Sequence, residues 1–102
     1  MCSSDLAANK HAVVGLARSL GPALAPDNVR FNAVCPGFAE SRIIDPLRDM
    51  LSEQGMPVIP AELVADTVLR IITGGGTGEC WFVQAGREAA AFNFRGIPGP
   101  RA

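Results

Sequence analysis

A lysine at the end of an apolar helical stripe is the residue best placed for chemistry. Lys10 lies three residues before Val13 and seven before Ala17, so helical spacing puts its charge in line with the stripe. Leu6 lies one turn earlier on the same face. A tyrosine at position 6 would make a proton-donating pair with the ammonium, because a nearby positive charge favours the phenolate. The alternative, which periodicity alone favours, is a lysine whose stem covers apolar surface.

Other catalytic chemistries lack the residue types that they need. The chain has no tyrosine and a single histidine, His11, on which any Ser–His–Asp or Cys–His apparatus would depend. The three cysteines, Cys2, Cys35 and Cys80, are odd in number and widely spaced, which argues against a disulfide framework and a zinc site. We therefore expect neither a metal centre nor a complete hydrolase of these kinds.

The composition is that of a soluble globular chain. The 102 residues are 48% hydrophobic and 19% charged, which allows one compact domain at most. A formal net charge of −1 leaves no excess of positive charge for a phosphate backbone, so we expect no nucleic-acid partner. No apolar run approaches the ~18 residues of a membrane span, and no export signal opens the chain. We expect a cytoplasmic protein with no membrane partner.

Apolar periodicity predicts helices and strands in alternation. Helices are indicated where apolar residues recur every three or four positions, and buried strands where short runs of β-forming residues end at proline or glycine. In chain order, the expected elements are a helix over 7–20, a strand over 29–35, a short helix over 45–54, a helix over 60–72 and a strand over 79–84.

The connections between these elements carry their own signals. Gly21-Pro22 should kink or interrupt the first helix, although residues 23–25 could still carry a last turn. Residues 38–59 mix charge, proline and apolar groups and should form a mobile flap, whereas no period remains after Arg87, where we expect an extended tail. The element order predicts an α/β layered sheet with parallel strands. Two strands are too few to complete such a sheet, so an open edge should remain.

Two stretches carry motifs that are weak alone and specific together. Residues 7–20 contain Lys10, and residues 29–37 end in Asn-Ala-Val-Cys-Pro-Gly. They resemble the C-terminal half of a short-chain dehydrogenase/reductase, in which a Tyr-x-x-x-Lys pair opens a helix and an Asn-x-Val-x-Pro-Gly strand end approaches the nicotinamide. The resemblance implies the C-terminal portion of a Rossmann-like, doubly wound parallel sheet, here with two strands and about three helices.

Site roles follow from this resemblance position by position. Lys10 falls on the lysine that binds the nicotinamide ribose hydroxyls and lowers the pKa of the tyrosine. Pro36-Gly37, which alone would be an ordinary turn, falls where a Cα without side chain lets the backbone pass close to the cofactor ring. Ser41 stands where the family often has a threonine that bonds the carboxamide. The expected cofactor-binding residues are Lys10, Pro36, Gly37, Phe38, Ala39 and Ser41, with Lys10 also catalytic.

The sequence departs from the family pattern at two points. Leu6 occupies the tyrosine position and can neither donate nor accept a proton. The family's Gly-rich dinucleotide turn and catalytic serine have no counterpart here, and the run 74–78 follows a predicted helix instead of preceding one. We therefore expect an N-terminally truncated protein. Its expected parts are a non-native leader over 1–6, a partial Rossmann-like domain over 7–86 and an extended tail over 87–102.

Two functions from different classes remain open at this point. The resemblance implies part of an NAD(P)-dependent oxidoreductase that transfers a hydride between nicotinamide and a carbonyl or alcohol. The intact parent would bind NAD or NADP and a small-molecule substrate and would form a homo-oligomer, whereas this chain should bind no cofactor tightly and be inactive. The alternative is a non-enzymatic interaction module in which Lys10 is merely structural.

Overall fold

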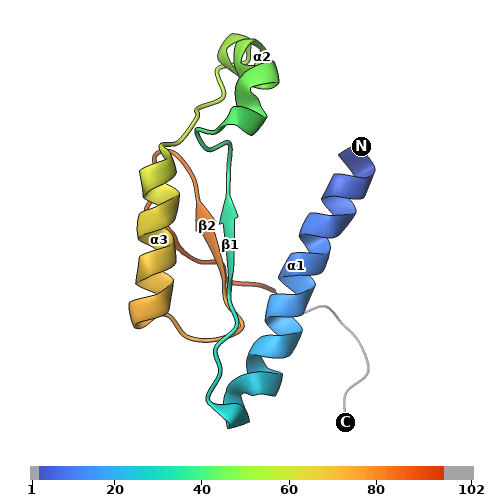
Figure 1. Ribbon diagram of the computed structural model, residues 1–102, viewed down its shortest axis with the longest axis vertical. Coiled ribbons are helices and arrows are strands. Elements are labelled where there is room, and N and C mark those ends of the chain that lie inside the picture. Colours follow the sequence, from blue (N-terminus) through green and yellow to red (C-terminus); the bar gives the residue numbers. More distant parts are fainter. Residues whose placement is uncertain (1–2, 96–102) are drawn as a thin grey trace.

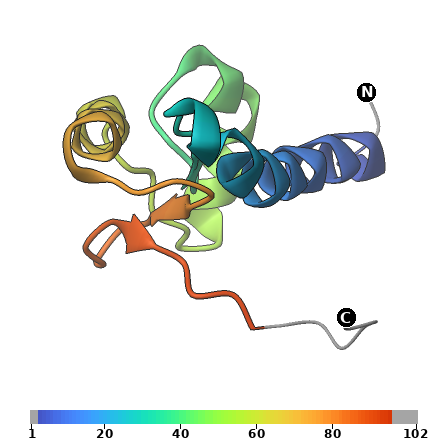
Figure 2. The same cartoon turned by 90° about the horizontal axis from the view of Figure 1, so that it is seen from below.

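A computed structural model describes residues 3–95 as three layers. Helix α1 covers one face of a small sheet and helix α3 covers the other, with α2 beyond the end of the strands (Figures 1 and 2). The elements are α1 (Ser3–Leu24), η1 (Ala25–Asp27), β1 (Ala33–Pro36), η2 (Arg42–Leu47), α2 (Arg48–Glu53), α3 (Ala61–Gly74), β2 (Cys80–Val83) and β3 (Ala90–Ala91), where η denotes a 3₁₀ helix.

The sheet has the order β1-β2-β3. Strands β1 and β2 are parallel, with Ala33 opposite Cys80, and α3 lies in the connection between them. This arrangement confirms the α/β fold class. The count of two strands was wrong, because β3 pairs antiparallel with β2 in the segment predicted to be only extended. Two alanines carry little β propensity, so no local pattern indicated this strand.

Small residues bring α1 close to the sheet. Ala17 is fully buried against Ala33 and Cys80, and Gly21 is buried where α1 meets the loop before β2. Helix α1 continues through Gly21-Pro22 to Leu24 instead of stopping there. Proline removes one helical hydrogen bond, but Thr77 Oγ1 donates to Gly21 O at 3.2 Å and anchors this turn to the loop.

The segment before β1 is not a strand, although residues 29–35 were predicted to form one. Its backbone and side chains bond instead to the loop that precedes β2. Phe31 N donates to Thr77 Oγ1 (3.1 Å), and Phe31 O accepts from Gly78 N (2.8 Å). Asn32 likewise donates to Gly76 O and accepts from Glu79 N. Because these hydrogen bonds go to a loop and not to a neighbouring strand, β1 begins only at Ala33.

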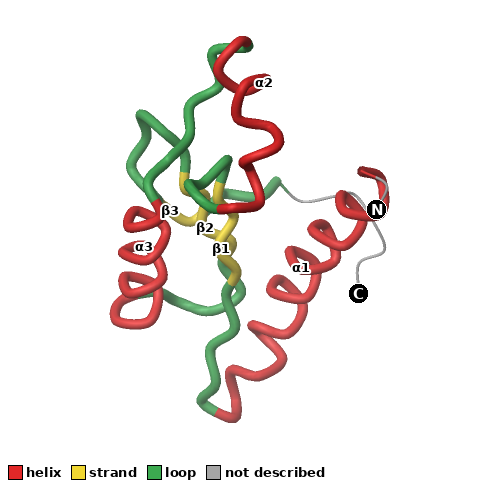
Figure 3. Tube along the Cα trace, turned by 45° about the horizontal axis from the view of Figure 1, so that its top comes forward, coloured by secondary structure: helices red, strands yellow, loops and turns green. Residues whose placement is uncertain are grey.

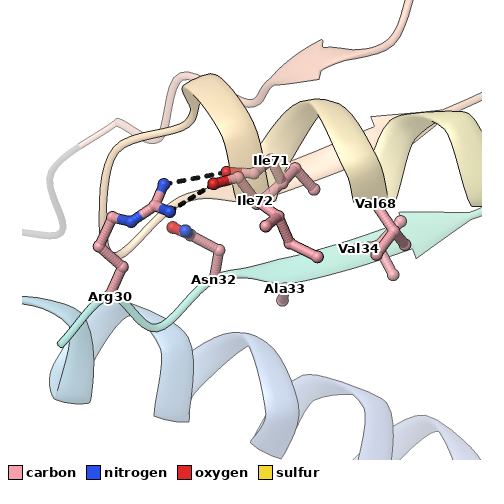
Figure 4. A pocket seen from close by; sticks show the side chains of 7 residues that line it. All are labelled: Arg30, Asn32, Ala33, Val34, Val68, Ile71 and Ile72. Carbon is pink, nitrogen blue, oxygen red and sulfur yellow. Dashed lines mark hydrogen bonds between the residues drawn. The ribbon is translucent and has the colours of Figure 1, made fainter.

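Arg30 holds the carboxyl end of α3 beside β1 (Figure 4). Its Nη1 donates to Ile71 O (3.0 Å) and to Gly75 O (2.8 Å), and its Nη2 donates to Ile72 O. The last carbonyls of a helix lack helical partners and carry partial negative charge, so a guanidinium is a favourable cap. Arg30 also lines one end of a pocket of about 240 Å³ between α3 and β1.

Residues 38–59 form a closed loop above the sheet (Figure 3). Its base is a parallel bridge in which Glu40 N donates to Ile59 O and Ile59 N donates to Phe38 O, each at 2.8 Å. The helix predicted over 45–54 is present as η2 followed by α2. Leu51 and Ile59 are buried, which anchors both halves of the loop.

Apolar side chains remain exposed on both outer helices, and β1 lies at the edge of the sheet. Within residues 3–95, no helix combines the length and apolar character needed to cross a bilayer. The exposed apolar residues of the two helices are Leu6, Val13 and Leu16 on α1 and Leu63, Val68, Leu69 and Ile72 on α3.

We expect the isolated chain to associate or to fold only in part, because an unpaired parallel edge and two apolar helix faces remain in water. Light scattering after size exclusion should give a mass above the 10.7 kDa monomer that falls on dilution. Leu16→Lys should reduce this mass, whereas Ala23→Lys, at an exposed site of the same helix, should not. A cooperative melt of a dilute monomer would contradict the prediction.

Candidate functional site

A cleft of about 450 Å³ lies between α1 and β1, and we call it the Lys10 cleft. It extends to the carboxyl end of β1, the end at which parallel sheets bind their ligands. Its wall is mostly apolar, and Lys10 brings a positive charge to it. The lining residues are Lys10, His11, Val13 and Val14 from α1 and Val34, Cys35, Pro36 and Gly37 from β1 and its end.

Gly37 lies at the carboxyl end of β1 and continues the strand pairing. Its N–H donates to Val83 O at 2.9 Å. A Cβ built on Gly37 would have Val83 O as its nearest contact, at 3.8 Å, which is an ordinary distance. Its φ is not among the positive values of the described residues. Neither backbone conformation nor packing within residues 3–95 therefore requires a glycine here, and its missing side chain leaves the Lys10 cleft open.

The residues after Gly37 diverge from the Lys10 cleft. Gly37 and Phe38 line a second cleft of about 360 Å³, together with Met56 and Ile59 from the far end of the loop. Ala39 lies in the bridge to Ile59. Ser41 is exposed at the start of η2 with extended backbone. Of the six expected cofactor residues, the structure thus brings Lys10, Pro36 and Gly37 together.

Leu6 lies one turn before Lys10 on α1, and about half of it is exposed (49%). It is not among the residues that line the Lys10 cleft. A phenol at this position would extend further than the leucine from the same helix face, towards the side of Lys10. The leucine side chain supplies no proton. The cleft therefore has the cation of Lys10, but position 6 provides no acid beside it.

Five of the eight lining residues were not predicted as site residues, and two of these five, His11 and Cys35, carry polar or reactive groups. His11 follows Lys10 directly in the sequence, and neighbours on a helix differ by about 100° in direction. The cleft is wide enough to include both, and the Nδ1–H of His11 donates to Ala7 O at 2.8 Å. Cys35 could have been found from strand alternation, because it shares a sheet face with Ala33, which packs on α1. Partial burial raises the pKa of the Cys35 thiol.

The ion pairs outside the cleft join exposed side chains at the surface. Arg48 contacts Glu40 Oε1 at 2.6 Å and Asp45 Oδ1 at 2.7 Å, and its guanidinium lowers the pKa of the exposed Glu40 carboxyl. Among residues 3–95, no group of three or more His, Cys, Asp and Glu side chains is arranged to hold a metal ion. In the pocket beside α3 the guanidinium of Arg30 is bonded to helix carbonyls. The Lys10 cleft, at the carboxyl end of β1, is therefore the stronger candidate for a ligand site.

Comparison with known proteins assigns the chain to a family. A family model described as enoyl-(acyl carrier protein) reductase matches residues 3–67, more than half of the chain. The chain is 40% identical to the 3-oxoacyl-(acyl-carrier-protein) reductase FabG of Staphylococcus aureus over 57 residues, which are 56% of this chain and 23% of that protein.

Two further relatives show the same partial overlap. Nodulation protein G of a Rhizobium species is 34% identical over 65 residues, 64% of this chain and 26% of that protein. The short-chain dehydrogenase anuF of Penicillium roqueforti is 34% identical over 89 residues, 76% of this chain and 32% of that protein. The chain thus spans less than a third of the length of these relatives. From its matched helix, strand and loop, it belongs to the short-chain dehydrogenase/reductase family.

Proposed function

We propose that this chain supplies the lysine-bearing helix and the Pro-Gly strand end of an NAD(P)-dependent oxidoreductase. The reaction is transfer of a hydride between nicotinamide and a carbonyl or alcohol. The observation that carries the proposal is the meeting of Lys10, Pro36 and Gly37 at one cleft, although Lys10 and Gly37 come from different layers of the fold. Ketoacyl and acyl-carrier-protein reductases among the relatives support this class of reaction.

The residues of the Lys10 cleft fit a nicotinamide nucleoside. Val13, Val14 and Val34 offer an apolar wall to a flat ring, and the Lys10 ammonium can donate to ribose hydroxyls. Gly37 leaves the space where a side chain would otherwise stand, and nothing within the described chain fills it. When bound, the nicotinamide would supply or accept the hydride.

Two parts of the catalytic machinery of such an oxidoreductase are absent from these residues. Leu6 holds no proton for a developing alkoxide, so the general acid of the reaction is absent from its family position. We propose that the 102 residues alone are inactive for this reason and because no dinucleotide turn is present in them. The second cleft, with Phe38, Met56 and Ile59, is proposed to contact the apolar part of a small-molecule substrate.

A non-enzymatic interaction module is the second candidate. The observation that favours it is the apolar surface of α1 and α3, where Leu16, Leu69 and Ile72 are more than half exposed. In that case the same half-sheet serves as a subunit surface, and Lys10 only covers part of α1. Stable assembly with another protein in the absence of any nucleotide would favour this candidate.

Titration with reduced nicotinamide mononucleotide, followed by amide chemical shifts, tests the proposed function. We expect weak, saturable shifts at Lys10, His11 and Gly37, in the millimolar range because only one wall of the site is present. Lys10→Ala should abolish them. Arg42→Ala also removes an exposed cation, on η2 and outside both clefts, and should leave the shifts unchanged. Absence of shifts at about 10 mM, which would detect about 3 kcal/mol of binding, would refute the proposal.

A further inference from the structure

Two cysteines from neighbouring strands face the same side of the sheet. Cys35 of β1 lies opposite Phe82, and Cys80 of β2 lies opposite Ala33, so the two cysteines are diagonal neighbours across the parallel pair. Cys80 is a member of the core under α1, and Cys35 packs against that core. Each thiol is close enough to the other to influence its pKa. Neither has a role in the proposed transfer of a hydride.

The pair lines a third cleft, which we call the aromatic cleft, of about 270 Å³. Its walls are apolar and largely aromatic, and two of its rings, Phe92 and Phe94, form an edge-to-face pair with centroids 5.0 Å apart. The guanidinium of Arg18 lies 4.0 Å from the centre of the Phe94 ring and holds that ring beside α1. The lining residues are His11, Val14, Cys35, Cys80, Phe82, Phe92 and Phe94.

The strand geometry opposes a direct disulfide between the two. A step of two residues along a strand and one strand across separates their Cα atoms by about 8 Å, from a rise of ~3.3 Å and a strand spacing of ~4.8 Å. A disulfide needs Cα atoms within about 7 Å and an S–S bond of about 2.05 Å. A single larger atom that bonds to both sulfurs can join two thiols that are too far apart for a direct S–S bond. The spacing of Cys35 and Cys80 therefore favours an atom bound between the two sulfurs over a disulfide.

We propose that Cys35 and Cys80 form a paired-thiol site for trivalent arylarsenicals, with the arsenic bonded to both sulfurs and the aryl ring in the aromatic cleft. With an arylarsenic oxide, two As–S bonds form while the As=O bond and both S–H bonds break. The oxygen leaves with the two protons as water. Arsenic stays trivalent, so the step needs no oxidant or reductant.

The environment distinguishes this pair from an ordinary reactive thiol. Burial raises the pKa of both thiols, which keeps them protonated near neutral pH and slows attack by either one alone on alkylating agents or peroxides. A reagent that bonds to both sulfurs binds more tightly, because the fold holds the two thiols near each other. Cys35, which lines both the Lys10 cleft and the aromatic cleft, is the more accessible of the two and is the sulfur that reacts first.

Phenylarsine oxide is the probe, applied to a Cys2→Ser background because Cys2 lies outside the described residues. Intact mass should show one phenylarsenic adduct per chain, formed with loss of one water. Excess glutathione, a monothiol, should leave the adduct in place, whereas 2,3-dimercaptopropanol should remove it. Release of the adduct by glutathione would overturn the proposal, whatever the variants do.

The matched control keeps two thiols but separates them. Cys80→Ala combined with Ala23→Cys moves one thiol to an exposed site at the end of α1, far along the helix from the cleft. This variant, and Cys35→Ser alone, should lose the glutathione-resistant adduct. Helical circular dichroism like that of the parent establishes that each variant is folded. Equal retention by the separated pair would show that chain flexibility, and not the aromatic cleft, brings the sulfurs together.

Discussion

Leu6→Tyr in this 102-residue chain should restore no measurable oxidation of NAD(P)H, whereas a chimera that adds a nucleotide-binding half should oxidise it. In the chimera, the nucleotide-binding half of a family relative precedes Ala7, with tyrosine at position 6. General acid catalysis contributes ~10²–10⁴ in rate. Binding and orientation of the cofactor are worth ~7–11 kcal/mol. A single substitution cannot supply this binding and orientation, which make the greater contribution to the rate.

Lys10 provides the internal control of this experiment. In the active chimera, Lys10→Ala should lower turnover by about 10²-fold, as expected for loss of one fixed donor. It should also raise the KM for the cofactor, because the same ammonium would serve the ribose and the phenol. Arg42→Ala, outside both clefts, should change neither quantity. Full activity of the Lys10→Ala chimera would show that the role assigned to Lys10 is wrong. Activity of Leu6→Tyr alone would reveal a cofactor site elsewhere in the chain.

Gly21→Ala should be the most destabilising alanine substitution of a helical glycine in this chain. A Cβ at position 21 would lie 2.3 Å from both Cα and N of Gly78 and 3.2 Å from the carbonyl carbon of Thr77. These are backbone atoms, and Gly78 cannot move freely because its N–H donates to Phe31 O and its φ is +72°. Overpacking costs typically ~1–3 kcal/mol, and contact with backbone places this site at the upper end.

Gly15→Ala is the matched substitution on the same helix. A Cβ at position 15 meets nothing within 4 Å. Alanine favours helix by about 1 kcal/mol over glycine, so this variant should be stabilised. In thermal melts at one fixed protein concentration, we expect the Tm of Gly21→Ala to be lower by about 14 °C and that of Gly15→Ala to be higher than the parent's. Equal Tm values would mean that α1 does not contact the loop before β2 at Gly21.

The long helices and the two parallel strands were predictable because their signals are local. Apolar spacing places α1 and α3 to within a few residues of their observed bounds, since each helix has one side against the sheet. The start of β1 was not predictable in this way. Residues 29–32 have strand-forming character, yet Phe31 and Asn32 bond to the loop at 76–79, which lies far along the chain. Val29 N donates back to Leu24 O instead of to a neighbouring strand.

The candidate site was predictable only in part for a similar reason. Lys10 and Gly37 stand in motifs that can be read directly, and the fold brings both to one cleft. His11 and Cys35 belong to no motif, and they line the cleft because of how α1 crosses β1. Ser41 was assigned by position alone, whereas the turn of the chain into η2 leaves it exposed and apart from Lys10.

The parallel pairing of β1 with β2 also sets the order in which the chain can fold. Helix α1 needs only neighbours along the chain, whereas the sheet must close a loop that contains α2 and α3. Loop closure opposes such contacts until late in folding, and parallel pairing is correspondingly slow. During synthesis, which proceeds from the N-terminus, β1 cannot complete its pairing with β2 until Val83 has left the ribosome. The core under α1 is thus completed only when nearly the whole chain has emerged.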